Sequence, residues 1–298
     1  MSDTIEWFSG IDNYRKHTLT FGPNSNTFTL ELLDVESRNV NTIHDAFEMH
    51  LSGATLPIEV LYSGGLDSEC VIAALLEQKI PVVAVTLRLL LNNAPVNFCD
   101  LYYSEKFCRE HQVKHNIVDF HIDKFYKNGD HLPYLEPYKF CIIPPASLLW
   151  LIEQCNTFPV LGGDYTWPQS QAKIYSPHRH DYNCYDHFMQ TRGITGIGNM
   201  LSHSLDCNSI FIREHQSMNL ADVVDKNILL NRLGFNLENR HRSWGWENVV
   251  EPSRWFDWRD YVPYLEDTFG PTRSVIKWSQ PFGNLIGANA GENDNFGI

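Results

Sequence analysis

A glycine-rich turn between a short apolar segment and a helical segment constrains the fold of this chain more than any other stretch. Residues 58–62 are the apolar run Ile-Glu-Val-Leu-Tyr, which is typical of a buried parallel strand. Residues 69–78 are rich in helix-forming residues, with apolar side chains at helical spacing. The turn between them is Ser63-Gly64-Gly65-Leu66-Asp67-Ser68. Because glycines let backbone N–H groups approach a ligand and Ser68 can cap the helix, the sequence predicts a phosphate site at this helix N-terminus.

This turn differs from two well-known nucleotide-binding fingerprints. A Walker A loop requires Gly-x-x-x-x-Gly-Lys-Ser/Thr, but residues 63–68 contain no lysine, and the dinucleotide pattern Gly-x-Gly-x-x-Gly is also absent there. The turn instead resembles the pyrophosphate loop of the N-type ATP pyrophosphatases, also called PP-loop enzymes. A helix is predicted directly before the strand, over residues 41–51, and this order is similar to the synthetase domain of asparagine synthetases.

The resemblance implies a substrate, a cofactor and a set of binding residues. ATP would be split into AMP and pyrophosphate while an oxygen of a carboxylate or carbonyl group is adenylylated, with Mg²⁺ as cofactor. In such enzymes the turn binds pyrophosphate, and the end of the second strand lies along adenine and ribose. Asparagine synthetases also carry a Gly-Glu-Gly-x-Asp-Glu turn after the fourth strand, which is shortened here to residues 162–164 without the glutamate. The nucleotide-binding residues implied are Ser63, Gly64, Gly65, Leu66, Asp67, Ser68, Val85, Thr86, Leu87, Gly162, Gly163 and Asp164. Asp67 and Asp164 would hold the Mg²⁺ ion, which prefers carboxylate oxygens beside phosphates.

Two lysines are candidates for reaching the α-phosphate. In asparagine-synthetase relatives a C-terminal lysine set among aromatic and glycine residues has this role, and residues 277–283, beginning with Lys277, are loosely similar. Lys173 competes for the same role. The predicted catalytic residues are therefore Asp67, Lys277 and Lys173.

Strands and helices alternate along the chain after the turn. The predicted segments are strands at 80–87, 115–120 and 158–161 and helices at 101–111 and 144–154. This alternation predicts an α/β fold with a parallel sheet, helices on both faces and right-handed crossovers. ATP would lie at the C-terminal ends of the strands, where open α/β sheets bind ligands.

Three regions are expected. Residues 1–41 are predicted to be an N-terminal extension with a short strand at 27–32, and residues 42–170 the ATP-binding α/β domain. Residues 171–298 are predicted to be a mostly helical substrate or cap region, with its clearest helix over 220–233. The glycines between 193 and 198 lack a preceding apolar strand, so they predict a loop that leads into a short helix.

Charge and cysteine usage restrict the partners and the compartment. The formal net charge of −13, from 23 basic and 36 acidic residues, disfavours nucleic acid, whose binders usually show a basic excess. Seven cysteines without any Cys-x-x-Cys pair indicate free thiols in a reducing compartment, and we expect a cytoplasmic location. No apolar run approaches the ~20 residues of a membrane-spanning helix, and the first residues are acidic, so neither a membrane span nor a secretory signal is expected.

The leading functional hypothesis is ATP-dependent, AMP-forming ligation of the asparagine-synthetase kind. A small carboxylate would be adenylylated and passed to ammonia or an amine. Position 2 is serine rather than the cysteine of many glutamine-dependent amidotransferases, and the segment before the turn is too short for a glutaminase domain. Nitrogen would therefore come from free ammonia, an amine or a separate glutaminase partner.

Other interpretations stay open. A PP-loop enzyme that modifies nucleosides or RNA is one, although such enzymes usually need paired cysteines. A non-catalytic nucleotide-binding subunit that keeps the loop is another. His178 and His180 have a spacing that can hold a metal, with Cys184 and His187 close by, but imidazoles that hold an anionic substrate, or a solvated loop, are the preferred interpretation. The acceptor, the amine donor and the oligomeric state are not indicated by the sequence.

Overall fold

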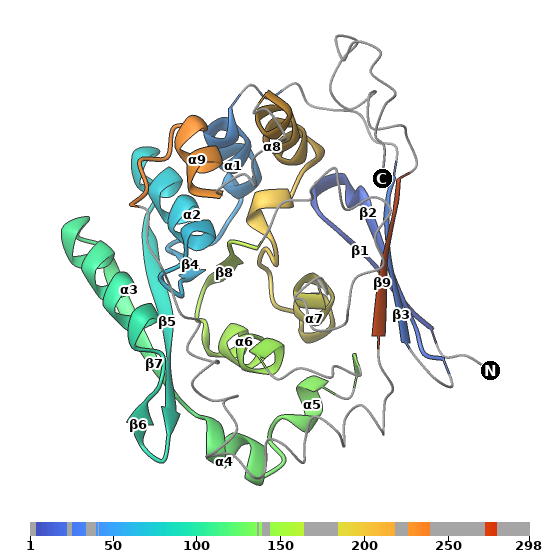
Figure 1. Ribbon diagram of the computed structural model, residues 1–298, viewed down its shortest axis with the longest axis vertical. Helices are drawn as coiled ribbons and strands as arrows, with labels where there is room; N and C mark the ends of the chain where they lie inside the picture. Colours follow the sequence, from blue (N-terminus) through green and yellow to red (C-terminus); the bar gives the residue numbers. More distant parts are fainter. Residues whose placement is uncertain are drawn as a thin grey trace.

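The computed structural model describes residues 4–22, 26–33, 40, 42–135, 137–138, 144–163, 184–217, 226–238 and 272–278. Two sheets and the helices around them make up this part of the chain (Figure 1). The strands of the central sheet are β4 (Ile58–Leu61), β5 (Val82–Leu91), β6 (Ala94–Pro95), β7 (Lys114–His121) and β8 (Phe158–Leu161). Strands β7, β5, β4 and β8 are parallel neighbours in that order, and the short β6 pairs antiparallel with the end of β5.

Helices cover both faces of the central sheet. Alternate side chains of the strands point to opposite faces, so Val60 belongs to one hydrophobic cluster and Leu61 to the other. The helices on the Val60 side are α1 (Ile43–Leu51), α2 (Leu66–Glu77), α3 (Phe98–Glu110), α8 (Leu205–Ser217) and α9 (Lys226–Arg232). The helices on the Leu61 side are α4 (Ile122–Lys127), α5 (Leu132–Leu135), α6 (Pro144–Gln154) and α7 (Cys184–Arg192). The predicted α/β fold, with a parallel sheet and helices on both faces, is confirmed.

A second sheet contains the N-terminal strands, of which the sequence predicted only one. Strands β1 (Thr4–Ser9), β2 (Arg15–Thr20) and β3 (Asn26–Leu32) are antiparallel, and β9 (Thr272–Trp278) lies parallel to β3. In Figure 1 this sheet stands at the right, with α6 and α7 between it and the central sheet. Trp7 and Leu19 belong to the same hydrophobic cluster as Leu61. The N-terminal strands therefore share a core with the α/β part.

Several predicted segments lie partly or wholly outside the described residues. Helix α9 falls inside the predicted helix 220–233, whose first six residues are not described. The described part of 171–298 contains α7, α8, α9, strand β9 and the 3-10 turn η3 (Met200–Ser202). The loop and short helix predicted around 193–198 are confirmed by η3. The division into three regions stays a prediction.

Within the described residues, no helix has both the length and the apolar character needed to cross a membrane. The described cysteines are free thiols; they are Cys70, Cys99, Cys108, Cys155, Cys184 and Cys207.

The burial of His203 leads us to expect that the protein loses stability in acid. Burial, together with the nearby His50 and Arg15, lowers the pKa of His203 from 6.5 to about 3. Between these two values the unfolded chain binds a proton that the folded chain does not, so stability falls as the pH falls, by up to about 1.4 kcal/mol per pH unit for one such group. We expect the pH dependence of urea denaturation between pH 6.5 and 4.5 to be flatter for His203→Asn than for the natural chain. Equal slopes would contradict this assignment.

Candidate active site

Three strand ends meet at one edge of the central sheet. The register pairs Leu61 of β4 with Val85 of β5 on one side and with Leu161 of β8 on the other. Because the strands are parallel, residues 62–65, 86–87 and 162–163 follow these pairs at the same edge. The structure thus brings together three of the segments that the sequence singled out for nucleotide binding.

The turn after β4 requires glycine for its shape and its packing. Gly64 has a φ of +70°, in the left-handed region that favours glycine. A Cβ at this position would lie 2.8 Å from the Asp100 carbonyl oxygen and 3.1 Å from Cβ of Tyr103, both in α3. Gly65 is extended, with φ −88° and ψ 157°, and is the N-cap residue of α2. The turn therefore lies between its own helix and α3, in a space that a side chain at Gly64 would fill.

Helix α2 begins three residues earlier than predicted, so Ser68 does not cap it. The first intrahelical bond joins the Glu69 amide to the Gly65 carbonyl at 3.0 Å, and the Ser68 hydroxyl, inside the first turn, donates to the same carbonyl at 3.3 Å. An uncapped helix N-terminus keeps its first amides and its positive dipole end available to an anion. Asp67, half-buried, lies in this same first turn.

Gly162 packs directly against the first turn of α2. A Cβ on Gly162 would be 2.7 Å from the Ser68 amide nitrogen and 2.8 Å from the Asp67 carbonyl carbon. The carbonyl of Gly162 accepts a hydrogen bond from the Leu201 amide at 3.0 Å, and Gly163, at a φ of +73°, lies against the Asn199 side chain. The turn after β8 is therefore held between α2 and η3. Asp164 lies outside the described residues.

Thr86 connects β5 to the start of the glycine-rich turn at residues 63–68, called the phosphate turn below because the sequence predicts a phosphate site there. Its hydroxyl donates to the Tyr62 carbonyl at 2.5 Å and lies 2.8 Å from Nε2 of His115 on β7. Val85 and Thr86 are buried and Leu87 is half-buried. These residues were expected at the end of the strand, but they lie in its middle, because β7 pairs with β5 from Val83 to Leu90 and supports it beyond the end of β4.

Removing the Thr86 hydroxyl should weaken this connection. We expect Thr86→Val to cost about 1–3 kcal/mol of unfolding free energy, because the buried Tyr62 carbonyl and His115 both lose a polar partner while the side-chain volume is kept. Urea denaturation measures the change. Thr29→Val, the same substitution at a half-buried position of β3, is the matched control. An equal effect in the two variants would rule out a special role for Thr86.

The acidic and thiol groups behind the turn are structural. Glu69 is buried and accepts a hydrogen bond from the Tyr62 hydroxyl. Burial, helped by nearby Glu69, raises the pKa of the Cys108 thiol to about 12, so this cysteine stays protonated and is a poor nucleophile. No group of three or more His, Cys, Asp or Glu side chains able to hold a metal is found among the described residues. Asp67 is thus the one predicted metal ligand within them.

The remaining predicted residues are placed only in part. Lys277 lies in β9, opposite Glu31 of β3, and Lys173, His178 and His180 lie outside the described residues. Cys184 is buried in α7, and Nδ1 of His187 lies 3.0 Å from the Tyr138 hydroxyl. The roles of the two lysines stay predictions.

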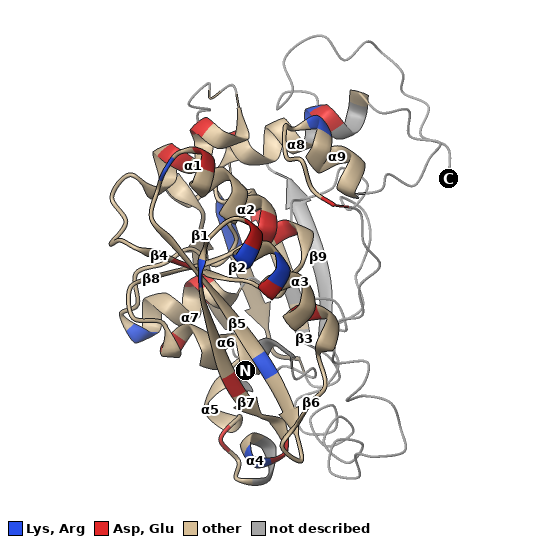
Figure 2. Ribbon diagram, turned by 90° about the vertical axis from the view of Figure 1, so that its left-hand side faces the viewer, with Lys and Arg blue, Asp and Glu red and all other residues tan. Residues whose placement is uncertain are grey.

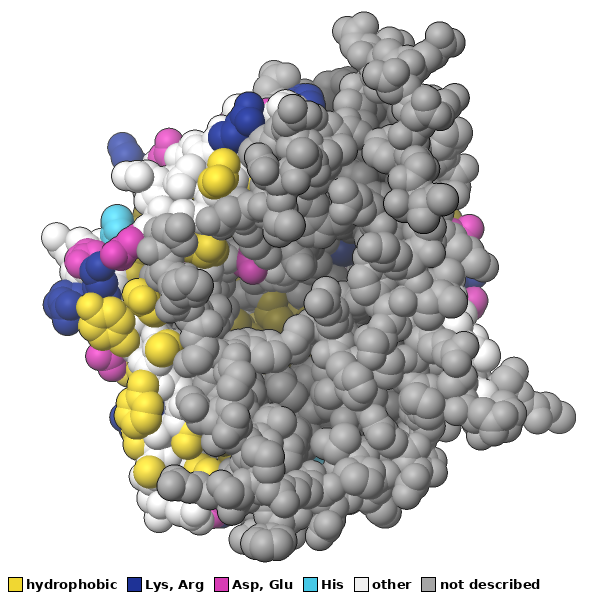
Figure 3. Space-filling view, viewed as in Figure 1, with side chains coloured by type: hydrophobic (Ala, Val, Ile, Leu, Met, Phe, Trp, Pro, Cys, Tyr) yellow, Lys and Arg dark blue, Asp and Glu magenta, His cyan; other side chains and the backbone are white. Residues whose placement is uncertain are grey.

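Aromatic side chains are exposed on the helix that flanks the turn. Phe98 and Tyr102 of α3 are 64% and 61% exposed, and the Asp100 carbonyl next to them faces Gly64. Hydrophobic side chains gather on the left flank in Figure 3, where Figure 1 places α3, β5 and β7. Apolar surface is therefore present beside the phosphate turn.

Comparison with known proteins assigns no family to the chain. No protein-family model matches it, and no curated protein matches it significantly. Among solved structures, similarity is found to an NH3-dependent NAD synthetase from Campylobacter jejuni, at 15% identity over 64% of this chain and 89% of that chain, with a TM-score of 0.30. A U34-tRNA thiolase from Methanococcus maripaludis is similar at 13% identity, 76% and 71% coverage and a TM-score of 0.30. A predicted subunit of a tRNA methyltransferase from Methanocaldococcus jannaschii is similar at 16% identity, 47% and 66% coverage and a TM-score of 0.29. Similarity at this level carries no argument about activity.

Proposed function

We propose that this chain is a PP-loop enzyme that binds ATP at the C-terminal edge of its central sheet and splits it into AMP and pyrophosphate. The observation that carries the proposal is the position of the turn at residues 63–68. It joins the end of a buried parallel strand to an uncapped helix N-terminus, and Gly162 lies against the first turn of that helix. Backbone amides and the helix dipole at such a place favour a phosphate chain.

The described residues fit a pyrophosphate leaving group with its metal. Gly64 and Gly162 both pack closely against backbone: a Cβ at Gly64 would lie 2.8 Å from the Asp100 carbonyl oxygen, and a Cβ at Gly162 2.7 Å from the Ser68 amide nitrogen. Asp67, in the first turn of α2, would hold Mg²⁺ together with phosphate oxygens, which suits an ion that commonly uses one or two carboxylates plus substrate phosphates. When bound, Mg²⁺ neutralises charge on the departing pyrophosphate.

We propose a small carboxylate as the acceptor and ammonia or an amine as the second nucleophile, as in asparagine synthetases. A carboxylate oxygen attacks the α-phosphorus, and the bond to the bridging oxygen breaks as pyrophosphate leaves. The amine then attacks the acyl carbon, AMP departs, and the nitrogen loses a proton to give an amide. The protein's contribution is positioning and stabilisation of developing charge. Lys173 and Lys277 remain the proposed contacts to the α-phosphate, and Asp164 a second proposed ligand of the metal.

Charge and thiol chemistry support a small acceptor in the cytoplasm. Acidic and basic residues are interspersed along the ribbon of the described elements in Figure 2, and the sequence as a whole has a net charge of −13. That balance favours a small-molecule acceptor over a nucleic-acid backbone. The free thiols of the described cysteines support a reducing compartment.

Phosphorus NMR of a turnover mixture tests the proposal. The protein is incubated with Mg-ATP, ammonium and a panel of small carboxylates, and we expect AMP and pyrophosphate to rise together in the presence of the right acid. ADP as the main product would overturn the assignment, because attack would then occur at the γ-phosphorus. If ATP binds but no AMP forms, whether carboxylates or RNA are added, the result would favour a non-catalytic nucleotide-binding subunit. AMP formation dependent on RNA alone would favour the nucleic-acid-modifying alternative.

A further inference from the structure

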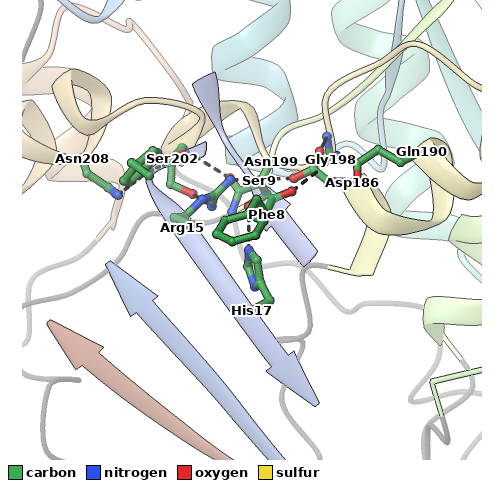
Figure 4. A network of polar contacts seen from close by, with 11 residues as sticks. Phe8, Ser9, Arg15, His17, Asp186, Gln190, Gly198, Asn199, Ser202 and Asn208 are labelled. Atoms are coloured by element: carbon green, nitrogen blue, oxygen red, sulfur yellow. Dashed lines mark hydrogen bonds and ion pairs between the residues drawn. The ribbon is translucent and has the colours of Figure 1, made fainter. Parts of the chain in front are cut away.

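A buried arginine joins the N-terminal sheet to the elements around the phosphate turn. Arg15, the first residue of β2, is only 2% exposed. Its Nη1 donates to the Ser202 hydroxyl at 2.7 Å, and its Nη2 lies 3.8 Å from Oδ2 of Asp186 on α7 (Figure 4). Removing a guanidinium from water costs several kcal/mol unless partners compensate for it. Leu19 of β2 also attaches the sheet, through the hydrophobic cluster that it shares with Leu61.

The partners of Arg15 fix the segment that precedes η3. The second carboxylate oxygen of Asp186 accepts a hydrogen bond from the Gly198 amide at 2.7 Å. A Cβ on Gly198 would lie 2.8 Å from the Asp186 amide nitrogen, so this segment passes α7 at backbone distance. Asp186 thus forms a long ion pair with Arg15 on one side and a hydrogen bond with the chain leading into η3 on the other.

Tyr14, the residue before Arg15, contacts the backbone of η3 with its side chain. The buried Tyr14 hydroxyl donates to the Ser202 carbonyl and accepts a hydrogen bond from the Asn208 side chain on α8 at 2.8 Å. Ser202 is therefore held by its side chain and by its carbonyl from two consecutive residues of the N-terminal region.

From η3 the contacts continue to the phosphate turn. The Asn199 side chain accepts a hydrogen bond from the Ser202 amide at 3.2 Å and lies against Gly163. The Leu201 amide donates to the Gly162 carbonyl, and Gly162 touches the backbone of Asp67 and Ser68. Fixing Ser202 therefore fixes the surface against which the first turn of α2 rests.

We infer that Arg15 is a positioning residue for the ATP site, acting through Ser202 and η3 on Gly162 and the first turn of α2. The inference rests on the proposed function for its effect on nucleotide binding, but the contacts themselves are independent of it. On this inference the N-terminal strands help to position the proposed ATP site, although they lie in a separate sheet. A displacement of a fraction of an ångström at Gly162 would pass directly to the backbone of Asp67 and Ser68, since a Cβ on Gly162 would lie only 2.7 Å from the Ser68 amide nitrogen.

The test uses Ser202→Ala, which removes the hydrogen bond to Arg15 and keeps its ion pair with Asp186, and Arg15→Lys, which keeps the charge but loses the planar fork. Hydrogen–deuterium exchange of the ATP-free full chain reports on the Glu69 amide, which donates to the Gly65 carbonyl in the first turn of α2. We expect this amide to exchange roughly tenfold faster in both variants, and calorimetry to show about tenfold weaker binding of Mg-ATP.

Glu59→Gln is the matched control. The buried Glu59 carboxylate accepts hydrogen bonds from the amides of Asn156 and Thr157 at the opposite end of β4, so its loss should lower stability without changing exchange at Glu69. Equal effects on the Glu69 amide in Ser202→Ala and Glu59→Gln, or no effect in Ser202→Ala, would overturn the inference. If the natural chain does not bind Mg-ATP, the proposed function fails, and the exchange of Glu69 still decides whether Arg15 positions the turn.

Discussion

Gly162→Ala is expected to reduce AMP formation by at least about tenfold, because a misplaced phosphate site loses the alignment on which the reaction depends. The added methyl group would lie 2.7–2.9 Å from three atoms of Asp67 and Ser68, all of them in the backbone. Backbone cannot rotate away as a flexible side chain can, so either α2 shifts or the turn after β8 does. Overpacking of this kind also costs about 1–3 kcal/mol of stability.

Gly53→Ala is the control for the substitution itself. Gly53 has no atom within 4 Å of a built Cβ, so Gly53→Ala should leave both stability and activity close to those of the natural chain. Glu59→Gln is the control for a loss of stability, because the buried Glu59 carboxylate accepts hydrogen bonds from the amides of Asn156 and Thr157 at the opposite end of β4 from the glycine-rich turn. It should destabilise the protein while preserving affinity for Mg-ATP, measured on folded samples. Loss of binding in Glu59→Gln equal to that in Gly162→Ala would show that the effect is a general loss of stability.

The central sheet could be predicted because its signals are local. Four-residue strands such as β4 and β8 are buried over their whole length, which gives the short apolar runs visible in the sequence. The helix over residues 43–51 follows a local signal as well, since the Thr42 side chain accepts a hydrogen bond from the Asp45 amide at 3.1 Å. The meeting of residues 62–65 with 162–163 then follows from parallel pairing alone.

The N-terminal sheet and the Arg15 contacts could not be predicted in the same way. Strand β9 pairs with β3 across more than two hundred residues, and no local pattern records such a pairing. Arg15 stands among the polar residues Lys16, His17 and Thr18 of β2, as a surface residue would. Its burial depends on Asp186 and Ser202, which are far away in the sequence. The start of α2 was predicted wrongly for a different reason. Its N-cap residue is Gly65, which has no side chain that could indicate a cap, so the nearby Ser68 was predicted as the cap instead.

Asp67→Asn is expected to lower the rate of AMP formation by more than about tenfold while leaving the fold intact, because Mg-pyrophosphate would lose a carboxylate ligand. The substitution keeps the size of a half-buried side chain in the first turn of α2. Removing an acidic group near a helix N-terminus costs only about 0.3–1 kcal/mol, so thermal denaturation should shift by a few degrees at most. Phosphorus NMR of AMP and pyrophosphate gives the rate.

Glu77→Gln makes the same change of acid to amide at the other end of the same helix, where the side chain is 71% exposed and lies 3.1 Å from His44. It should preserve the rate, because it is remote from the turn for which we propose phosphate binding. The dependence on Mg²⁺ separates the two possible causes of a loss in Asp67→Asn. If Asp67 holds the metal, raising the Mg²⁺ concentration should restore part of the rate in Asp67→Asn and change little in Glu77→Gln. An unchanged rate in Asp67→Asn at low Mg²⁺ would remove Asp67 from the metal site and leave the phosphates to the backbone of the turn alone.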